Sequence, residues 1–341
     1  MLKKKVIHKK DFISSILDKY IMHNEHNINS DFLTGKAGLL IYYSIYSSND
    51  RQSKYIYNML LKEILTETPE STSLCINNGG LLGIGISLCY ILKRNAESNG
   101  DNVLEDLDKK VIIECGKILT NSQIDKKKNI ELILYMSIRL SIRINNALRE
   151  SIFRKSIIDL IERTYYSLGL SIYEEAIPFT LFNPLYLFLD ALIRLYGMGI
   201  NIQRINHILK ELGSMVRLPI FHANRLMLLY LTIKINKATG YRLRTWSEME
   251  KLLIENTKKD VILNSEFSKN QINFENGISS MYLFMLLCNK ISNKCIFSFD
   301  KDEYLKKIFQ SSIIKTRSIV DGTMFIGLNG YWGMRLLYDK I

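Results

Sequence analysis

Proline is scarce in this chain of 341 residues, which excludes frequent breaks in helices. Only four prolines occur, at Pro69, Pro178, Pro184 and Pro219. Because proline removes a backbone donor and disrupts helix interiors, so few of them leave room for many uninterrupted helices. Strand-like alternation bounded by turn signals is nearly absent as well. We therefore expect an all-α protein.

Paired cysteines are also missing. The five cysteines are Cys75, Cys89, Cys115, Cys288 and Cys295, and none of them forms a CxxC motif. Structural zinc sites use short paired spacings, so we expect none here. All but the last lie among apolar neighbours, where a free thiol behaves as a small hydrophobe. This pattern is typical of a reducing compartment.

Long hydrophobic runs are also absent from this sequence. The most apolar stretches, 81–92 and 225–235, are far shorter than the ~20 residues that a membrane-spanning helix needs. The longer stretch 179–200 is interrupted by polar and charged residues. Basic residues 1–10 are followed by Asp11 and polar residues rather than by an apolar run, which is unlike a signal peptide. We expect a soluble protein of the cytoplasm that binds no membrane.

Acidic residues are in deficit, with 34 Asp and Glu against 46 Lys and Arg, for a net charge of +12. Such a field attracts nucleic acid, acidic peptides or a membrane surface. The charge is dispersed into small clusters at 3–5, 9–10 and 126–128, and we expect the last cluster in a solvated turn beside Asp125. Basic residues interleaved with exposed aromatics, typical of single-strand binding, do not stand out, so we do not expect a nucleic-acid partner.

Two kinds of helical segment alternate along the chain. The amphipathic kind carries apolar residues at helical spacing and charges elsewhere. Its stripes are Phe153, Ile157, Leu160, Ile161 and Leu168; Ile205, Ile208, Leu209 and Leu212; Trp246, Met249, Leu252 and Leu253; and Leu305, Ile308 and Phe309. Thr245 and Glu248 have the spacing of a capping box at the start of the third.

The second kind is apolar on nearly every side, and such a helix must be buried on every side. It occupies 38–43, 81–92, 185–195, 226–233 and 281–288. We expect Tyr42 and Tyr43 to lie in the core and His207, on a polar helix face, to be solvated. The alternation predicts an inner and an outer layer of helices.

Glycine-rich openings precede several of the buried segments. They are marked by Gly35, Gly80, Gly277 and Gly330. The long gap between Gly80 and Gly277 accommodates three further units, for which we expect openings near Ile130, at Asn183-Pro184 and at 222–225. Seven helical hairpins result, and they could close into a ring.

Each glycine of an opening lets a neighbouring backbone approach closely. Gly35 and Gly38, Gly80 and Gly83, and Gly330 and Gly333 each place two such positions on one helix face. Asn276 and Asn329, each directly before a glycine, are expected to be N-caps. We assign 1–30 to an N-terminal helical segment packed on the domain and 31–341 to a single domain.

These Gly-x-x-Gly openings, with Gly327-Leu-Asn-Gly330, resemble those of the lanthionine synthetase C-like (LanC-like) family. The stretch 77–108 looks like divergent, Bacteroidetes-type members of that family. The resemblance implies an α/α toroid with inner and outer helix layers. It also implies lantibiotic biosynthesis, in which a zinc ion held by two cysteines and a histidine activates a peptide thiol to close thioether rings.

The positions that correspond to the zinc ligands are changed in this chain. Where the family has Trp-Cys-x-Gly and Cys-His-Gly, this sequence has 221–224, Phe-His-Ala-Asn, and 275–277, Glu-Asn-Gly. A further family histidine corresponds to Asn183. We therefore expect no metal cofactor, although the family uses zinc, and no assignable catalytic residue.

Three interpretations of this degenerate zinc site remain open. His222 and Glu275 could form a re-cast metal site. His222 and Asn276 could merely cap helices, with Glu275 favouring a helix dipole. Asn183, His222, Glu275 and Asn276 could line a central cavity that binds a peptide.

The function expected from the resemblance is zinc-free binding of a precursor peptide, or of its leader, as an accessory to peptide-modifying enzymes. The alternatives are an active peptide cyclase with a different site around His222 and Glu275, or a glycan-acting toroid. Paired carboxylates are the usual catalysts of glycan hydrolysis. Here Glu174-Glu175 and Glu275 are the only acids near expected openings.

Overall fold

The computed structural model describes residues 18, 21–22, 28–46, 51–66, 73–77, 79–95, 100–121, 123–142, 144–167, 177–267, 271–298, 300–310 and 333. Within these ranges every regular element is a helix, thirteen of them α-helices and one a π-helix. The expectation of an all-α protein is confirmed for this part of the chain.

The helices follow one another with short connections. They are α2 (Lys36–Tyr46), α3 (Arg51–Thr66), α4 (Leu81–Asn95), α5 (Gly100–Thr120), α6 (Lys126–Arg139), α7 (Ala147–Ser167), α8 (Pro184–Gly197), α9 (Ile202–Met215), α10 (His222–Thr239), α11 (Arg244–Asn256), α12 (Lys259–Val261), the π-helix η3 (Ile262–Glu266), α13 (Ile278–Ser292) and α14 (Lys301–Gln310).

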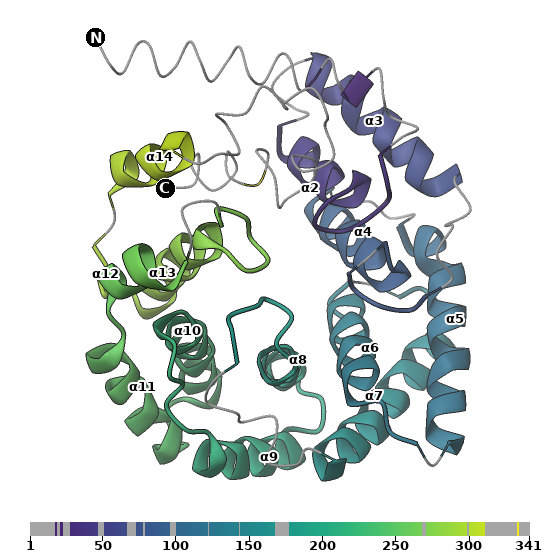
Figure 1. Cartoon of the computed structure of the whole chain (residues 1–341). Coiled ribbons are helices and arrows are strands. Elements are labelled where there is room, and N and C mark those ends of the chain that lie inside the picture. The colour runs from purple at the N-terminus through teal and green to yellow at the C-terminus, as the bar shows by residue number, and fades with distance from the viewer. Residues whose placement is uncertain are drawn as a thin grey trace.

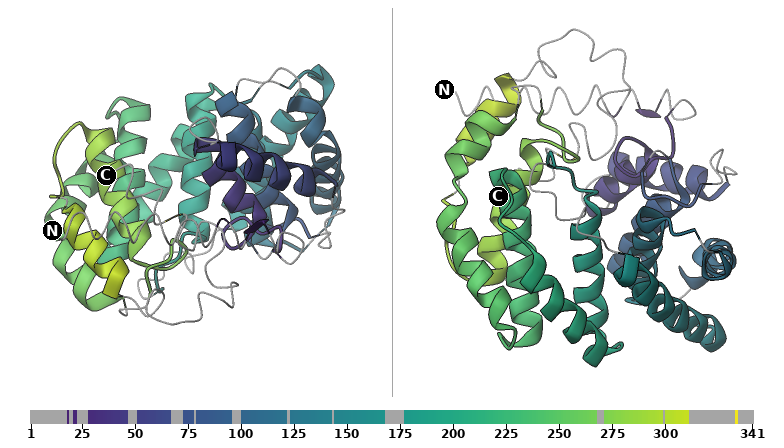
Figure 2. Two further views of the ribbon diagram at one scale, coloured as in Figure 1. Left: turned by 90° about the horizontal axis from the view of Figure 1, so that it is seen from above. Right: turned by 60° about the horizontal axis from the view of Figure 1, so that its bottom comes forward.

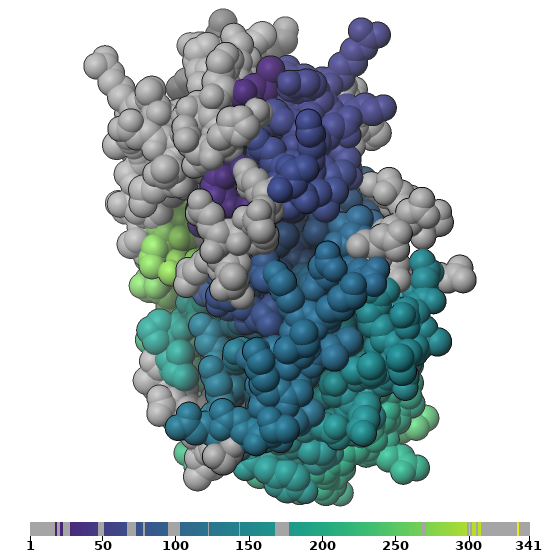
Figure 3. Space-filling view, turned by 90° about the vertical axis from the view of Figure 1, so that its right-hand side faces the viewer, coloured from purple at the N-terminus to yellow at the C-terminus, as the bar shows by residue number. Residues whose placement is uncertain are grey.

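Alternate helices form a curved layer. Each of α2, α4, α6, α8 and α10 packs against the next member of the series, which ends at α13 (Figure 1). Helices α3, α5, α7, α9 and α11 each pack against the member that precedes them, on the outside of the curve. We call the two sets inner and outer helices. Figure 3 shows outer helices α3, α5 and α7 covering one side of the molecule.

Burial follows this division. Nine consecutive residues of α2, Lys36 to Ser44, are buried, and they include Tyr42 and Tyr43 as predicted. Among the outer helices, α9 buries its predicted stripe, whereas α11 buries only Trp246 and Leu253. The prediction for Leu252 is wrong, because its side chain is 41% exposed. The buried apolar side chains of the described residues form one connected core.

Inner helices begin close to where the repeat predicts them. The openings at Gly35, Gly80, Asn183 and Gly277 directly precede α2, α4, α8 and α13, and α10 begins at His222. The start expected near Ile130 is four residues too late, because Asp125 accepts a hydrogen bond from the Lys128 backbone (3.0 Å) and caps α6. The cluster 126–128 is therefore the first turn of a helix rather than a solvated turn.

The seventh opening, with Gly330, lies outside the described residues, as do Asn329, Leu168, His8, His23, His26 and Trp332. Gly333 is described and is buried. At the other end of the chain, Ile21 and Ile28 belong to the core, and the Tyr43 hydroxyl donates to Asp18 at 2.5 Å.

Glycines at the openings meet the preceding loop at very short range. A Cβ atom at Gly83 would lie 2.0 Å from the Ile76 carbonyl oxygen, and one at Gly80 would lie 2.2 Å from that of Cys75. Gly35 is similarly close to Asn29, and Gly277 to Gln271 and Asn273. No side chain fits at these distances, so the predicted close approach of a neighbouring backbone is confirmed at these four glycines.

Candidate functional site

The start of α10 holds a carboxylate from the chain itself. Glu266, the last residue of η3, accepts hydrogen bonds from the backbone N–H groups of His222 (2.6 Å) and Ala223 (2.8 Å). The first N–H groups of a helix have no intrahelical partner and form the positive end of its dipole. Glu266 therefore satisfies two of them and fixes η3 against α10. No motif in the sequence marks Glu266, and sequence reasoning missed it.

His222 ties the same helix start to the segment after α11. Its Nδ1 accepts a hydrogen bond from the Lys258 backbone N–H at 3.1 Å, so the neutral ring carries its proton on Nε2. Burial, assisted by the nearby Arg225 guanidinium, lowers the pKa of His222 below its usual value. The ring is therefore neutral at pH 7. Phe221, not His222, is the N-cap of α10, so the prediction of a capping role for His222 is wrong.

Asn183 caps α8, directly before Pro184. Its side-chain oxygen accepts a hydrogen bond from the Leu185 backbone at 3.0 Å, and the residue is only 6% exposed. Nearby, Asn224 of α10 donates from its amide to the Ile177 carbonyl at 2.6 Å. The openings of α8 and α10 are thereby held together.

Glu275 lies where the opening of α13 meets the opening of α8. Its backbone carbonyl accepts a hydrogen bond from the Leu181 N–H at 2.8 Å. Asn276 is exposed, and Gly277 is the N-cap of α13, so the predicted N-cap role of Asn276 is wrong. The side chain that orders this turn is Asn273, which accepts from the Asn276 backbone at 3.1 Å.

The structure thus brings the openings of α8, α10 and α13 together at one end of the inner layer, where Figure 2 shows the loops before α8 and α13 side by side. Asn183 and Glu275 lie in two openings that hydrogen-bond to each other, and His222 lies in the third. Glu266, rather than Glu275, is the carboxylate that reaches the start of α10.

A metal ion would need more donors than this arrangement assembles. Nowhere in the described part of the chain do three His, Cys, Asp or Glu side chains lie close enough to share an ion. Both oxygens of Glu266 accept backbone hydrogen bonds, and Nδ1 of His222 does the same. These groups therefore hold the start of α10 against η3 and against the segment after α11.

A second polar cluster joins α8 and α10 further along their length. Asp190 forms ion pairs with Lys234 and with Arg194, the latter at 2.6 Å. The Tyr230 ring centre lies 5.2 Å from the Lys234 amine. Burial alone would raise the pKa of Asp190, but the two cations outweigh it and lower the pKa. This carboxylate is therefore ionised at neutral pH.

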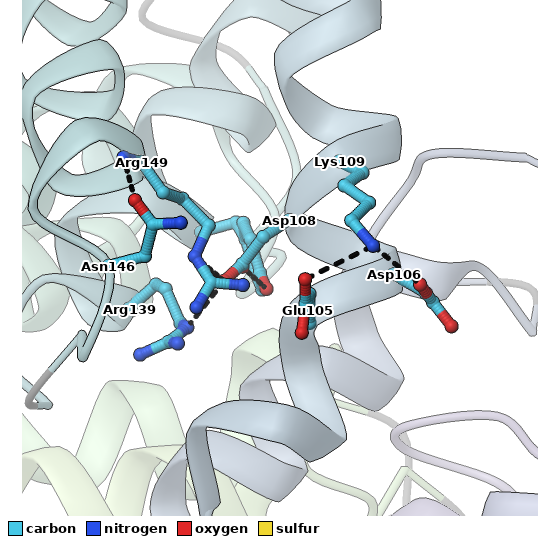
Figure 4. A network of polar contacts seen from close by, with 8 residues as sticks. Glu105, Asp106, Asp108, Lys109, Arg139, Asn146 and Arg149 are labelled. Atoms are coloured by element: carbon cyan, nitrogen blue, oxygen red, sulfur yellow. Dashed lines mark hydrogen bonds and ion pairs between the residues drawn. The ribbon is translucent and has the colours of Figure 1, made fainter.

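The most deeply buried ionic cluster ties α5, α6 and α7 together (Figure 4). Asp108 is fully buried and accepts from the Arg139 guanidinium at 3.1 Å and from the Tyr135 hydroxyl at 2.9 Å. Arg149 of α7 lies 3.7 Å from the same carboxylate. Its neighbours Glu105, Asp106 and Lys109 instead pair with one another on the exposed side of α5. The cluster is a structural tie between three helices, which no spacing in the sequence predicts.

The described residues define an all-helical protein with a layered arrangement of helices. No family model, no curated protein and no solved structure matches the chain. Within the described ranges, no helix has both the length and the apolar character needed to span a lipid bilayer.

Proposed function

We propose that this chain is a LanC-like protein whose helices close into an α/α toroid of seven hairpins. In this proposal it binds a ribosomally synthesised precursor peptide and assists its maturation without zinc. Six inner helices begin 38 to 58 residues apart, and this succession supports a seven-unit repeat of variable length. Residues 221–224 and 275–277, which the resemblance matches to the two zinc-binding motifs of that family, lie at the starts of α10 and α13.

The observation that carries the proposal is the joining of three openings at one end of the inner layer. The Leu181–Glu275 and Asn224–Ile177 hydrogen bonds hold them in place. A peptide needs a rigid set of donors and acceptors, because ordering a flexible site would reduce its affinity. The half-buried imidazole of His222 and the exposed amide side chain of Asn276 lie beside these openings.

Calorimetric titration with the peptides encoded beside this gene tests the proposal. We expect one of them to bind, and His222→Ala to weaken that binding about tenfold by removing a hydrogen bond worth ~1.4 kcal/mol. The matched control is His207→Ala, because His207 is exposed on α9 and pairs with Glu211 of the same helix. His222→Gln keeps an acceptor for the Lys258 N–H and separates loss of the ligand contact from local unfolding.

Two results would contradict the proposal. One is that no neighbouring precursor binds. The other is that His222→Ala and His207→Ala bind the precursor equally well. If the protein alone converts the bound peptide to a cyclised product, the enzyme alternative replaces the accessory role, and mass spectrometry of alkylated peptide thiols detects that conversion.

A further inference from the structure

Four of the six inner helices end in exposed basic side chains; α2 has none in its last turn, and that of α6, Arg139, is buried. Last-turn residues are Lys93 and Arg94 in α4, Arg194 in α8, Lys237 in α10 and Lys290 in α13. All five are exposed. Arg194 pairs with Asp190, and within the described ranges no carboxylate pairs with the other four.

These five residues share one face of the molecule. Helices α8, α10 and α13 start together at their joined openings. Helix α4 starts beside α2 and α6, because Asp31 accepts from the Gly79 backbone at 2.6 Å and Glu131 accepts from the Ile76 backbone at 3.1 Å. The two groups meet where α6 packs on α8, and the inner helices run side by side (Figure 2). Their last turns therefore lie opposite the openings. We call Lys93, Arg94, Arg194, Lys237 and Lys290 the basic end face.

A cation at a helix C-terminus is by itself explained by the helix dipole, which stabilises it by ~0.3–1 kcal/mol. Three consecutive inner helices, α8, α10 and α13, all end this way, and α4 does so on the far side of α6, whose last-turn Arg139 is buried against Asp108. Together they produce a field that such local stabilisation does not require. Packed helices lie ~8–10 Å apart, and an extended peptide advances ~3.3 Å per residue, so acidic residues at every third position match this spacing. A nucleic-acid strand carries a charge about every 3.4 Å and would leave most of its phosphates unmatched.

We propose that the basic end face binds an acidic segment of the precursor peptide. This inference rests on the proposed function, and it gives the two ends of the inner layer different tasks. The openings hold the peptide through hydrogen bonds, whereas the basic end face attracts its acidic segment through charge.

Fluorescence anisotropy with a labelled synthetic peptide of about twelve residues, with Asp at every third position, tests this assignment. The matching peptide with Asn at those positions is the ligand control. The charge-reversed protein carries Lys93→Glu, Arg94→Glu, Lys237→Glu and Lys290→Glu. Its matched control carries Lys110→Glu, Lys155→Glu, Lys210→Glu and Lys251→Glu, four exposed positions on outer helices α5, α7, α9 and α11.

We expect the acidic peptide to bind the native chain and the Asn peptide to bind at least about tenfold more weakly. Charge reversal at the basic end face should weaken binding of the acidic peptide at least tenfold. The control reversal should change its affinity only about twofold. Circular dichroism checks that both proteins remain helical. If the fourfold variant does not fold, the double variant with Lys237→Glu and Lys290→Glu replaces it.

If the two charge-reversed proteins lost the same affinity for the acidic peptide, the assignment would be overturned, because only the net charge would then matter. It would also be overturned if an oligonucleotide or an anionic vesicle bound this face more tightly than the acidic peptide. The proposed function has a separate test, because precursor binding that depends on His222 survives even if the acidic peptide does not bind. Conversely, binding of the acidic peptide without any precursor binding would refute the proposed function and the assignment of the acidic segment to a precursor, while the basic end face would remain a site for acidic peptides.

Discussion

The described glycines differ in their surroundings: one group has a backbone pressed against it, a second lies in open space, and Gly85 and Gly213 face side chains. Gly83 belongs to the first group, with the Ile76 carbonyl 2.0 Å from an added Cβ, and Gly116 in α5 to the second, with no atom within 4 Å. Both lie in α-helices. The sequence predicts the close approach at Gly83 because a second glycine precedes it by three residues.

Alanine substitutions at these two helical glycines should have opposite effects. We expect Gly83→Ala to lower the free energy of unfolding by about 1–3 kcal/mol, because the loop before α4 must move. Gly116→Ala should raise it by about 0.5–1 kcal/mol, since alanine restricts the unfolded chain and favours the helix. Urea unfolding followed by circular dichroism measures both, and a stabilising Gly83→Ala would contradict the close approach.

The ionisation of His222 should make stability depend on pH. Burial, with Arg225 nearby, places the pKa of His222 below its ordinary value of 6.5. The unfolded chain then binds a proton at higher pH than the native protein does. The stabilising contribution is therefore present above pH ~6.5 and is lost as the pH falls toward the lower native pKa.

Chemical unfolding at pH values of about 7.5 and about 5.5 measures this loss. We expect the native chain to lose more unfolding free energy between them than His222→Gln does. The exposed His207→Gln should behave like the native chain. If all three proteins lose the same amount, the histidine at the start of α10 does not titrate as its surroundings require.

A few polar contacts between residues far apart in the sequence hold the helices together. Asp108 of α5 is fully buried and is held by Arg139 of α6 and Arg149 of α7. Removing one partner of a buried ion pair leaves an uncompensated charge. Arg139→Met should therefore cost about 3–5 kcal/mol of stability.

The matched control for this buried pair is Arg154→Met in α7. Arg154 pairs with Glu150 at 2.7 Å, but both side chains are solvent-exposed. We expect a cost below ~1 kcal/mol, because water screens such pairs and their ordering costs entropy. Similar unfolding midpoints for the two variants would show that Asp108 does not depend on Arg139.

Glu266 joins η3 to α10 by accepting hydrogen bonds from the first backbone N–H groups of α10. Glu266→Ala should lower stability by about 0.5–2 kcal/mol, as expected for loss of a helix-capping acceptor. Glu255→Ala, at an exposed position near the end of α11, is the control and should change stability by less than ~0.5 kcal/mol. Thermal unfolding compares them, and equal melting temperatures would argue against the capping role.

Helix starts could be predicted because their signals are local, whereas the caps and ties could not. Glycine, or Asn-Pro at 183–184, stands beside the helix that it introduces. Thr245 and Glu248 have the spacing of a capping box, yet Leu243 is the N-cap of α11, so this prediction is wrong. The Thr245 hydroxyl is buried without a hydrogen-bond partner among the described residues, so it caps no backbone N–H of α11. Glu266 and Asp108 contact residues far away in the sequence, which no local pattern marks.

At the scale of the whole molecule, the inner helices begin at one end of their layer, and α4, α8, α10 and α13 terminate in exposed basic residues at the other. The alternation of fully buried and half-buried segments predicts the two layers, because each burial pattern demands its own surroundings. Neither the substrate nor the polar contacts of the site follow from that pattern. Closure of the toroid is the remaining structural claim, and it requires the opening at Gly330 to lie next to the one at Gly35.

A spin-label distance tests this closure most directly. Labels are attached at Thr34→Cys, an exposed position before α2, and at Asn329→Cys, in a chain that carries Cys75→Ser and Cys295→Ser. Adjacent helices lie about 8–10 Å apart, so a closed ring predicts a single distance of ~20 Å or less between the labels. A distance beyond ~40 Å, several helix spacings, would show an open arrangement and contradict the toroid.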